Sequence, residues 1–233
     1  MFLIPPIIKR LCHQPTAATK FLVLLLSADL VFILIQIPYR MGVMSNPYFS
    51  IETDMGYAEI YQYVKEFWII LLLLGIAVQR PRAIYFAWMC LFIYVLCDDA
   101  LSVHENVGRW IGTQLDLQPM FGLRPRDFGE LIVSVVAGGV LFSSIGVAYF
   151  FSDLHGKIMS RYLMGLFALL VLFGVGVDMI HQMVSFGKDA WGVIEDGGEM
   201  CIISLMVWYL FNLQPPAPGP RIPTPRNPAS VPS

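Results

Sequence analysis

Acidic and histidine side chains occur near one end of several apolar segments of this sequence. If these segments cross a membrane in alternate directions, all of these groups lie in the same leaflet. A carboxylate near hydrocarbon is costly, about 2.5–3.5 kcal/mol for Asp at a helix centre, so a convergent set indicates a functional site. The five groups are Glu59 with Glu66, Asp98-Asp99 with His104-Glu105, Glu130, Asp178 with His181, and Glu195-Asp196 with Glu199.

Helical spacing decides which of these side chains share a face. Asp178 and His181 are three residues apart, so both can reach one centre. The same carboxylate-x-x-His spacing occurs as Glu-x-x-His in dimetal helical bundles. Glu199 is four residues after Glu195 and three after Asp196, and we expect it to be the central carboxylate of its segment.

On a continuous third helix, Asp98, Ser102 and Glu105 line one stripe and His104 points elsewhere. Two imidazoles with several carboxylates suit one zinc ion with an open position, or two bridged iron or manganese ions. Such an ion lowers the pKa of bound water towards about 7, and a nearby carboxylate can act as a general base. The predicted metal ligands are His104, Asp178, His181, Glu199, Asp98 and Glu130, and the predicted catalytic residues are Glu105 and Glu195.

Ion pairing is an alternative interpretation of the same residues. Asp98 and Asp99 can pair with one of the arginines at 109, 124 and 126, and Glu66 can pair with Lys65 or with another neighbour. Glu130, which opens a helix, can be an anchor at the helix dipole rather than a ligand. Asp29 stands alone deep in the first apolar segment, where we expect a helix neighbour to satisfy it.

Between the polar groups the sequence is strongly apolar. Hydrophobic residues make up 57% of the 233 residues and charged residues only 14%, which is typical of an integral membrane protein. The apolar runs 21–38, 67–78, 83–97, 131–151, 162–177 and 200–213 each predict a helix once their polar ends are included. The expected fold is therefore an all-α polytopic membrane bundle of six transmembrane helices.

Lysine and arginine residues predict the orientation of this bundle. With both termini in the cytoplasm, nine of the fifteen basic residues lie inside, five lie outside and Lys65 lies at the boundary, in agreement with the positive-inside rule. Three parts follow: a cytoplasmic N-terminal segment at 1–20, the transmembrane domain at 21–213 and a Pro-rich tail at 214–233. A short interfacial helix is expected around 107–115, above the acidic groups.

The expected partners are membrane lipids and a protein that binds the tail, because the tail has no hydrophobic face of its own. No nucleic-acid partner is expected, because the net charge is −2 and no basic patch faces an aqueous domain. The four cysteines do not form a secreted disulfide framework, because one is cytoplasmic in this topology and three lie in helices.

Three strings of residues carry a family resemblance: Asp98-Asp99-Ala-Leu-Ser-Val-His104-Glu105, Asp178-Met-Ile-His181 and Glu195-Asp196-Gly-Gly-Glu199-Met. Over about residues 55–212 they resemble an uncharacterised family of bacterial six-helix membrane proteins, which implies the bacterial inner membrane. The chain is more vaguely similar to the alkaline-ceramidase-like membrane hydrolases, whose bundles hold a zinc ion with histidines, an Asp and a Ser. That similarity implies hydrolysis, with similar residue types supplied by Asp98, Ser102, His104, Asp178 and His181.

The sequence therefore favours a metal-dependent membrane hydrolase that acts on a lipid or another amphiphile at the outer leaflet. Three alternatives stay open. A dimetal oxidoreductase is favoured by the excess of carboxylates over histidines, a cation or proton carrier by the intramembrane carboxylates, and a non-catalytic subunit of a larger membrane complex by the Pro-rich tail.

Overall fold

The computed structural model describes residues 17–116, 118, 125–177 and 188–214, and these residues form helices and short connections without a strand. The predicted all-α class is confirmed for this part of the chain. The helices are α2 (Ala17–Arg40), α3 (Tyr57–Gln79), α4 (Ala83–Leu101), α5 (Val103–Gln114), α6 (Pro125–Phe150), α7 (Leu154–Val171) and α9 (Lys188–Asn212), with a 3-10 turn η1 (Pro47–Phe49) and a π-helical turn η2 (Leu172–Val177).

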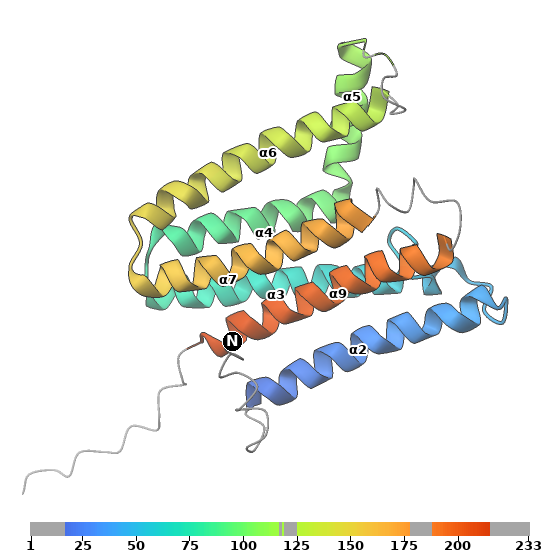
Figure 1. Cartoon of the computed structure of the whole chain (residues 1–233), viewed down its shortest axis with the longest axis horizontal. Helices are drawn as coiled ribbons and strands as arrows, with labels where there is room; N and C mark the ends of the chain where they lie inside the picture. The colour runs from blue at the N-terminus through green and yellow to red at the C-terminus, as the bar shows by residue number, and fades with distance from the viewer. Residues whose placement is uncertain (1–16, 117, 119–124, 178–187, 215–233) are drawn as a thin grey trace, which may run out of the picture.

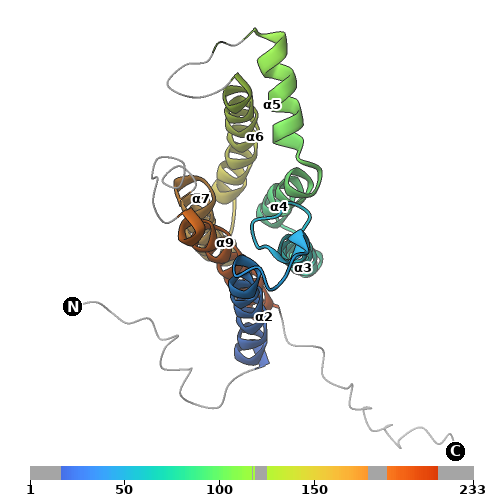
Figure 2. The ribbon, with the colours of Figure 1, turned by 90° about the vertical axis from the view of Figure 1, so that its right-hand side faces the viewer.

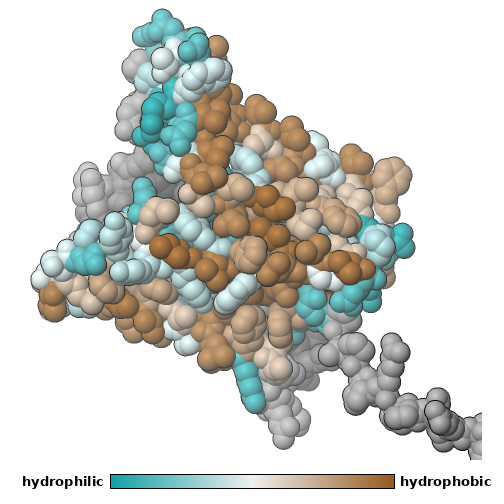
Figure 3. All heavy atoms as spheres, turned by 180° about the vertical axis from the view of Figure 1, so that it is seen from behind, coloured by the Kyte–Doolittle hydropathy of each residue, from teal (hydrophilic) through white to brown (hydrophobic). Residues whose placement is uncertain are grey.

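Five helices are long and apolar enough to cross a bilayer: α2, α3, α4, α6, and α7 extended to Gly174. Hydrophobic residues lie across the middle of the molecular face in Figure 3, and hydrophilic residues gather towards its ends. The chain is therefore a membrane protein. Helix α9 has 25 residues but carries several charged residues, so the sixth crossing, the orientation of the termini and the bacterial inner membrane stay predictions.

Local sequence signals explain where several helices begin and end. The connection between α3 and α4 contains Pro81, which cannot continue the hydrogen bonding of α3. Pro125 begins α6, where its missing N–H costs no hydrogen bond. Asp153 caps α7 by accepting a hydrogen bond of 2.9 Å from the backbone N–H of Gly156. The α3–α4 and α6–α7 connections are short, so the two helices of each pair are antiparallel.

Because the helices alternate in direction, six helix ends meet at one end of the bundle (Figure 1). They are the C-terminal ends of α2, α4 and α7 and the N-terminal ends of α3, α6 and α9. We call this the acidic end, because it carries Glu59, Glu66, Asp98, Asp99, Glu130, Glu195, Asp196 and Glu199. The predicted shared depth of these groups is thus observed for the described residues.

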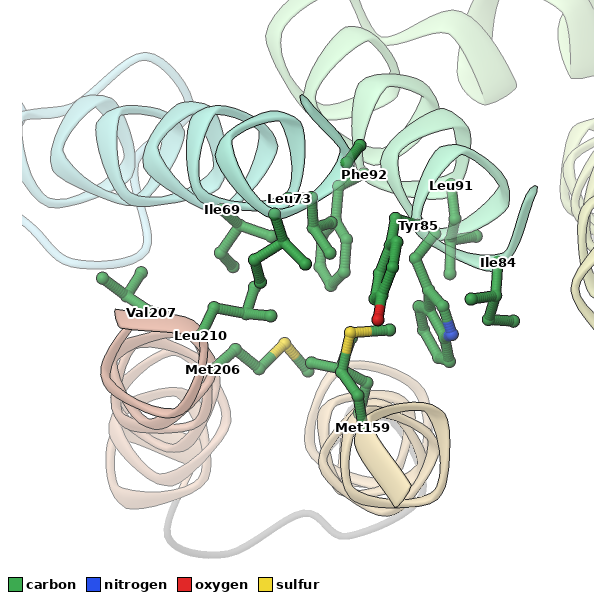
Figure 4. Close-up of a cluster of buried hydrophobic side chains, with 14 of the residues drawn as sticks. Ile69, Leu73, Ile84, Tyr85, Leu91, Phe92, Met159, Met206, Val207 and Leu210 are labelled. Carbon is green, nitrogen blue, oxygen red and sulfur yellow. The ribbon is translucent and has the colours of Figure 1, made fainter. Parts of the chain in front are cut away.

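The half of the bundle away from the acidic end is a packed apolar core. Figure 4 shows side chains of α3, α4, α7 and α9 pointing towards one another there. Trp88, Phe92, Met159 and Met206 are each at most 1% exposed. The Trp88 indole donates a hydrogen bond of 2.9 Å to the Ser160 hydroxyl, so its polar atom is satisfied within the core. Among the described residues, this half of the bundle is therefore packed mainly by apolar side chains.

Helix α5 departs from the sequence prediction. Ser102 adopts a left-handed backbone (φ 47°), which ends α4 and turns the chain into α5. Helix α5 rises beside the first turns of α6 instead of covering the acidic groups (Figures 1 and 2). The expected short helix is present, but its position above the acidic groups is not observed, and its place at a membrane interface stays a prediction.

Helix α6 is held mainly at its two ends. Its buried residues are Gly129, which lies under α5, and Ile145 and Ala148, which lie near its C-terminus. Between 130 and 144 no residue is buried. The middle of α6 is therefore less buried than its ends, although Leu141 and Phe142 pack against the core, and Figure 2 shows α6 on the side of the bundle opposite α2.

The α5–α6 contact depends on glycine, because a Cβ on Gly129 would collide with the backbone of Gly108. We expect Gly129→Ala to lower the free energy of unfolding by about 1–3 kcal/mol, the usual cost of overpacking. Gly146→Ala is the matched control on the same helix, because a Cβ there meets nothing within 4 Å. Unfolding of both variants in detergent micelles tests this, and equal stability of the two would contradict the close contact.

Candidate functional site

Two cavities of opposite character meet at the acidic end. The larger has a volume of about 550 Å³ and is lined by α3, α4, α6, α7 and α9. The smaller, of about 160 Å³, is lined by residues 51–54 and by α3, α4 and α9. Gln62, Asp99 and Glu199 line both cavities, and we call these three residues the junction.

The smaller cavity is polar and electronegative. No lysine or arginine is among the described residues that line it. One of its carboxylates is neutralised nearby, because Arg40 binds Glu52 at 2.5 Å. Water and cations are therefore the species that this cavity favours. Its acidic residues are Glu52, Asp54, Glu59, Asp99, Asp196 and Glu199.

The larger cavity is apolar along most of its length and acidic at one end. The rings of Phe142 and Phe167, 5.4 Å apart, line its apolar part. Its polar end is formed by Gln62, Glu66, Asp98, Asp99, His104 and Glu199. Apolar walls that end in a few convergent polar groups are typical of ligand sites.

Glu66 is the most unusual group of the site. Its side chain is 1% exposed, and neither carboxylate oxygen has a hydrogen-bond partner among the described residues. Asp99 and Glu199 are close enough to act on it electrostatically. Two carboxyl groups can hydrogen-bond to each other only if one of them carries a proton, and an unpaired buried carboxylate is costly. This cluster therefore requires a proton or a bound cation.

Glu199 is held between two helices. The Gln62 side-chain amide donates to one carboxylate oxygen at 3.4 Å. The other oxygen lies so close to Gly174 in η2 that a Cβ there would overlap it. Glu199 thus connects α3 with the π-helical turn, and such turns frequently occur at functional sites.

A second buried polar group lies beside the site. Lys65 and Asp29 are both 0% exposed and form an ion pair of 2.8 Å between α3 and α2. The Lys65 ammonium also donates to the Met200 carbonyl (2.8 Å), and the Ser204 hydroxyl donates to Asp29 (2.6 Å). Asp29, which stands alone in its own segment, is therefore satisfied by α3 and α9. Lys65 pairs with Asp29 and forms no ion pair with Glu66.

Asp98 and His104 are joined by two hydrogen bonds on the wall of the larger cavity. One Asp98 oxygen accepts the backbone N–H of His104 at 2.7 Å and the other lies 2.9 Å from its Nδ1. The prediction that His104 points away from Asp98 is wrong, because the chain turns at Ser102. The hydrogen bond to Asp98 raises the pKa of the His104 imidazole above its ordinary value, while partial burial opposes this.

Three other predicted site residues lie outside both cavities. Arg126 binds Glu105 at 2.8 Å and Glu130 at 2.5 Å, so these two carboxylates are ion-paired at the α5–α6 contact. Arg109 is a further neighbour of Glu105, at 3.9 Å. Glu195 lies on α9, one turn before Glu199. Within the described residues, the arginine ion pairs thus involve Glu105 and Glu130, whereas the ion-pair alternative assigned the arginines to Asp98 and Asp99.

The predicted metal centre is not observed as a preformed cluster. Within the described part of the chain, no three His, Cys, Asp or Glu side chains are grouped as ligands of one ion. Asp178 and His181 lie outside the described residues. The zinc, iron or manganese ion therefore stays a prediction.

Comparison with known proteins gives the family. A family model for a domain of unknown function, DUF8692, matches residues 18–213. The chain belongs to the DUF8692 family. This agrees with the resemblance to an uncharacterised family. No curated protein and no solved structure matches the DUF8692 chain, so its similarity to the ceramidase-like hydrolases stays a prediction.

Glu66 and Asp99 belong to the predicted convergent set but to neither the predicted ligands nor the predicted catalytic residues, and Gln62 is not predicted from the sequence. A signal for two of them is present, because Glu59, Gln62 and Glu66 follow the three- and four-residue spacing of one helical face. The alternative interpretation of Glu66 is an ion pair with Lys65, because the two residues are adjacent in the sequence. Adjacent residues of a helix face different directions, and here Lys65 faces α2 instead.

Proposed function

We propose that this protein is a metal-dependent membrane hydrolase of an amphiphile, with its reaction centre at the junction. The supporting observation is that a polar cavity and an apolar cavity share Gln62, Asp99 and Glu199. Hydrolysis of an amphiphile needs water and an oily substrate at the same atoms. The smaller cavity is suited to water and the larger to the substrate.

The residues of the junction suit this chemistry. A carboxylate within reach of water accepts its proton as a general base, and Asp99 and Glu199 both line the water-suited cavity. The Gln62 amide donates to Glu199 and thereby fixes its orientation. The scissile bond of the substrate would lie at the polar end of the larger cavity, between these groups.

Carboxylate and amide oxygens are donors for hard divalent cations, and no lysine or arginine lines either cavity among the described residues. The donor chemistry therefore fits a cation. Glu66, Asp99 and Glu199 would contribute oxygens to it, together with the predicted ligands Asp178 and His181, which follow η2 in the sequence. When bound, the ion would polarise the substrate and lower the pKa of water.

The packed core argues against the alternative of a cation or proton carrier. A carrier needs polar groups that continue through the membrane. Among the described residues, the charged groups buried beside the site are Asp29 and Lys65, which pair with each other, and the core of Figure 4 is formed mainly by apolar side chains. A site reached from one side favours an enzyme.

Element-resolved metal analysis of the purified full chain tests the proposal. We expect at least one divalent transition metal per chain, and we expect Glu199→Gln to lower this content by about tenfold for each 1.4 kcal/mol of lost binding. Asp116→Asn is the control, because Asp116 is an exposed turn residue outside both cavities.

The same preparations are then incubated with fluorogenic ester and amide amphiphiles. Turnover that is lost with a chelator and restored by the metal supports the hydrolase. A metal-free unmodified protein would reject the proposal, and so would a metal-loaded protein that cleaves neither substrate.

A further inference from the structure

We infer that the larger cavity binds the hydrocarbon chain of an amphiphile that enters sideways from the bilayer, between α6 and α7. This inference rests on the proposed function and names the part of the substrate that the protein recognises. The polar head of the amphiphile would lie at Glu66, Asp99 and Glu199.

The first argument is the lateral opening of the cavity. The middle of α6 contributes Val135, Gly138 and Phe142 to its wall, and no residue between 130 and 144 is buried. Val135 is 63% exposed although it lines the cavity. An apolar cavity that is open at membrane depth is filled by hydrocarbon in preference to water.

The second argument is the shape and chemistry of the cavity. A volume of about 550 Å³ lies within the roughly 300–1,000 Å³ of small-molecule sites. Its apolar walls come from three helices beside α6 and end at the carboxyl cluster. The apolar lining includes Leu91, Val95, Leu141, Phe142, Phe167 and Leu170.

The third argument is independent of the cavity walls. Glu66 is 1% exposed, both of its oxygens are without a hydrogen-bond partner among the described residues, and it lines the polar end of this cavity. Such a group is costly unless a proton shared with a neighbouring carboxyl group, or a ligand, supplies a donor or a charge. A head group with a hydroxyl, an amide or an ammonium supplies that donor. The chain and the head thus find complementary surroundings in one cavity.

Gly138 and Gly139 provide a matched pair of variants. Gly138 lines the cavity, and a Cβ there only touches Phe142 at 3.9 Å. Gly139 does not line it, and a Cβ there meets nothing within 4 Å. Phenylalanine at 138 therefore fills the cavity, whereas phenylalanine at 139 extends into the surrounding lipid.

The experiment is photolabelling of the full chain in nanodiscs, with a chelator present, by hexadecanol that carries a diazirine in its chain. We expect label on the cavity residues of α6 and α7, competed by plain hexadecanol. We expect Gly138→Phe to reduce this label by about tenfold, equivalent to 1.4 kcal/mol, and Gly139→Phe to leave it unchanged. Val135→Trp is a second blocking variant should Gly138→Phe not fold.

Label that is not competed, that is equal in the two glycine variants, or that is spread evenly over the lipid-facing residues of α2 would overturn the inference. This experiment measures the binding of hexadecanol to the protein without metal, and it is therefore independent of activity. Specific labelling, combined with a protein that contains no metal as purified or that cleaves neither substrate, would therefore support the chain site while rejecting the hydrolase, and metal-dependent turnover without specific labelling would do the opposite.

Discussion

Replacing Lys65 with methionine lowers the free energy of unfolding by about 3–5 kcal/mol, the usual cost of removing one partner of a buried ion pair. Asp29 is 0% exposed and has Lys65 as its cationic partner at 2.8 Å. Without Lys65 the carboxylate keeps the Ser204 hydroxyl at 2.6 Å, which does not neutralise its charge. Unfolding by heat and by SDS in micelles measures the loss.

The double variant Asp29→Leu/Lys65→Met separates a structural role from a chemical one. Buried ion pairs exchanged for apolar residues are often neutral in stability, and the Ser204 hydroxyl can turn to a backbone carbonyl of its own helix. We expect the double variant to recover most of the loss. If the double variant is as unstable as Lys65→Met, the unpaired Asp29 carboxylate is not the cause of the instability of the single variant.

Replacing Glu66 with methionine has the opposite effect in metal-free protein. The substitution raises the free energy of unfolding by about 1–3 kcal/mol, because it removes a buried group without a hydrogen-bond partner. Methionine is similar in length, and its thioether does not need a hydrogen-bond partner when it is buried. A stabilising substitution at a buried position is characteristic of a site where function is maintained at the expense of stability.

Glu52→Gln is the control for this experiment. Glu52 belongs to the same acidic end but is bound by Arg40 at the surface, and an exposed pair contributes only about 0–1 kcal/mol. We expect this variant to be neutral or slightly destabilised. If Glu66→Met is itself destabilised in a chelator, Glu66 contributes to folding and the carboxyl cluster is structural.

The helices and their shared acidic end could be predicted from the sequence because both follow from apolar runs that alternate in direction. The motif residues extend the helices as expected: α3 begins at Tyr57 and α9 at Lys188, well before the apolar runs themselves. Such features depend on composition and period, which are local properties of the sequence.

The partners of the polar groups could not be predicted, because they depend on tertiary contacts and on one backbone angle. No local pattern shows that Lys65 faces Asp29, which lies 36 residues earlier. Ser102 is not a residue type that usually ends a helix, and its left-handed backbone alone brings His104 back to Asp98. The same turn carries α5 to α6, where Arg126 binds two of the expected catalytic and ligand carboxylates.

The packed apolar core of Figure 4 also bears on where the products of the proposed hydrolysis would go. Cleavage of an amphiphile at the junction yields a water-soluble fragment and an oily fragment. The first would depart through the smaller, polar cavity at the acidic end, and the second would return to the lipid past α6. The reaction would thus be vectorial: one product is released on a single side of the membrane, and the other is retained within it.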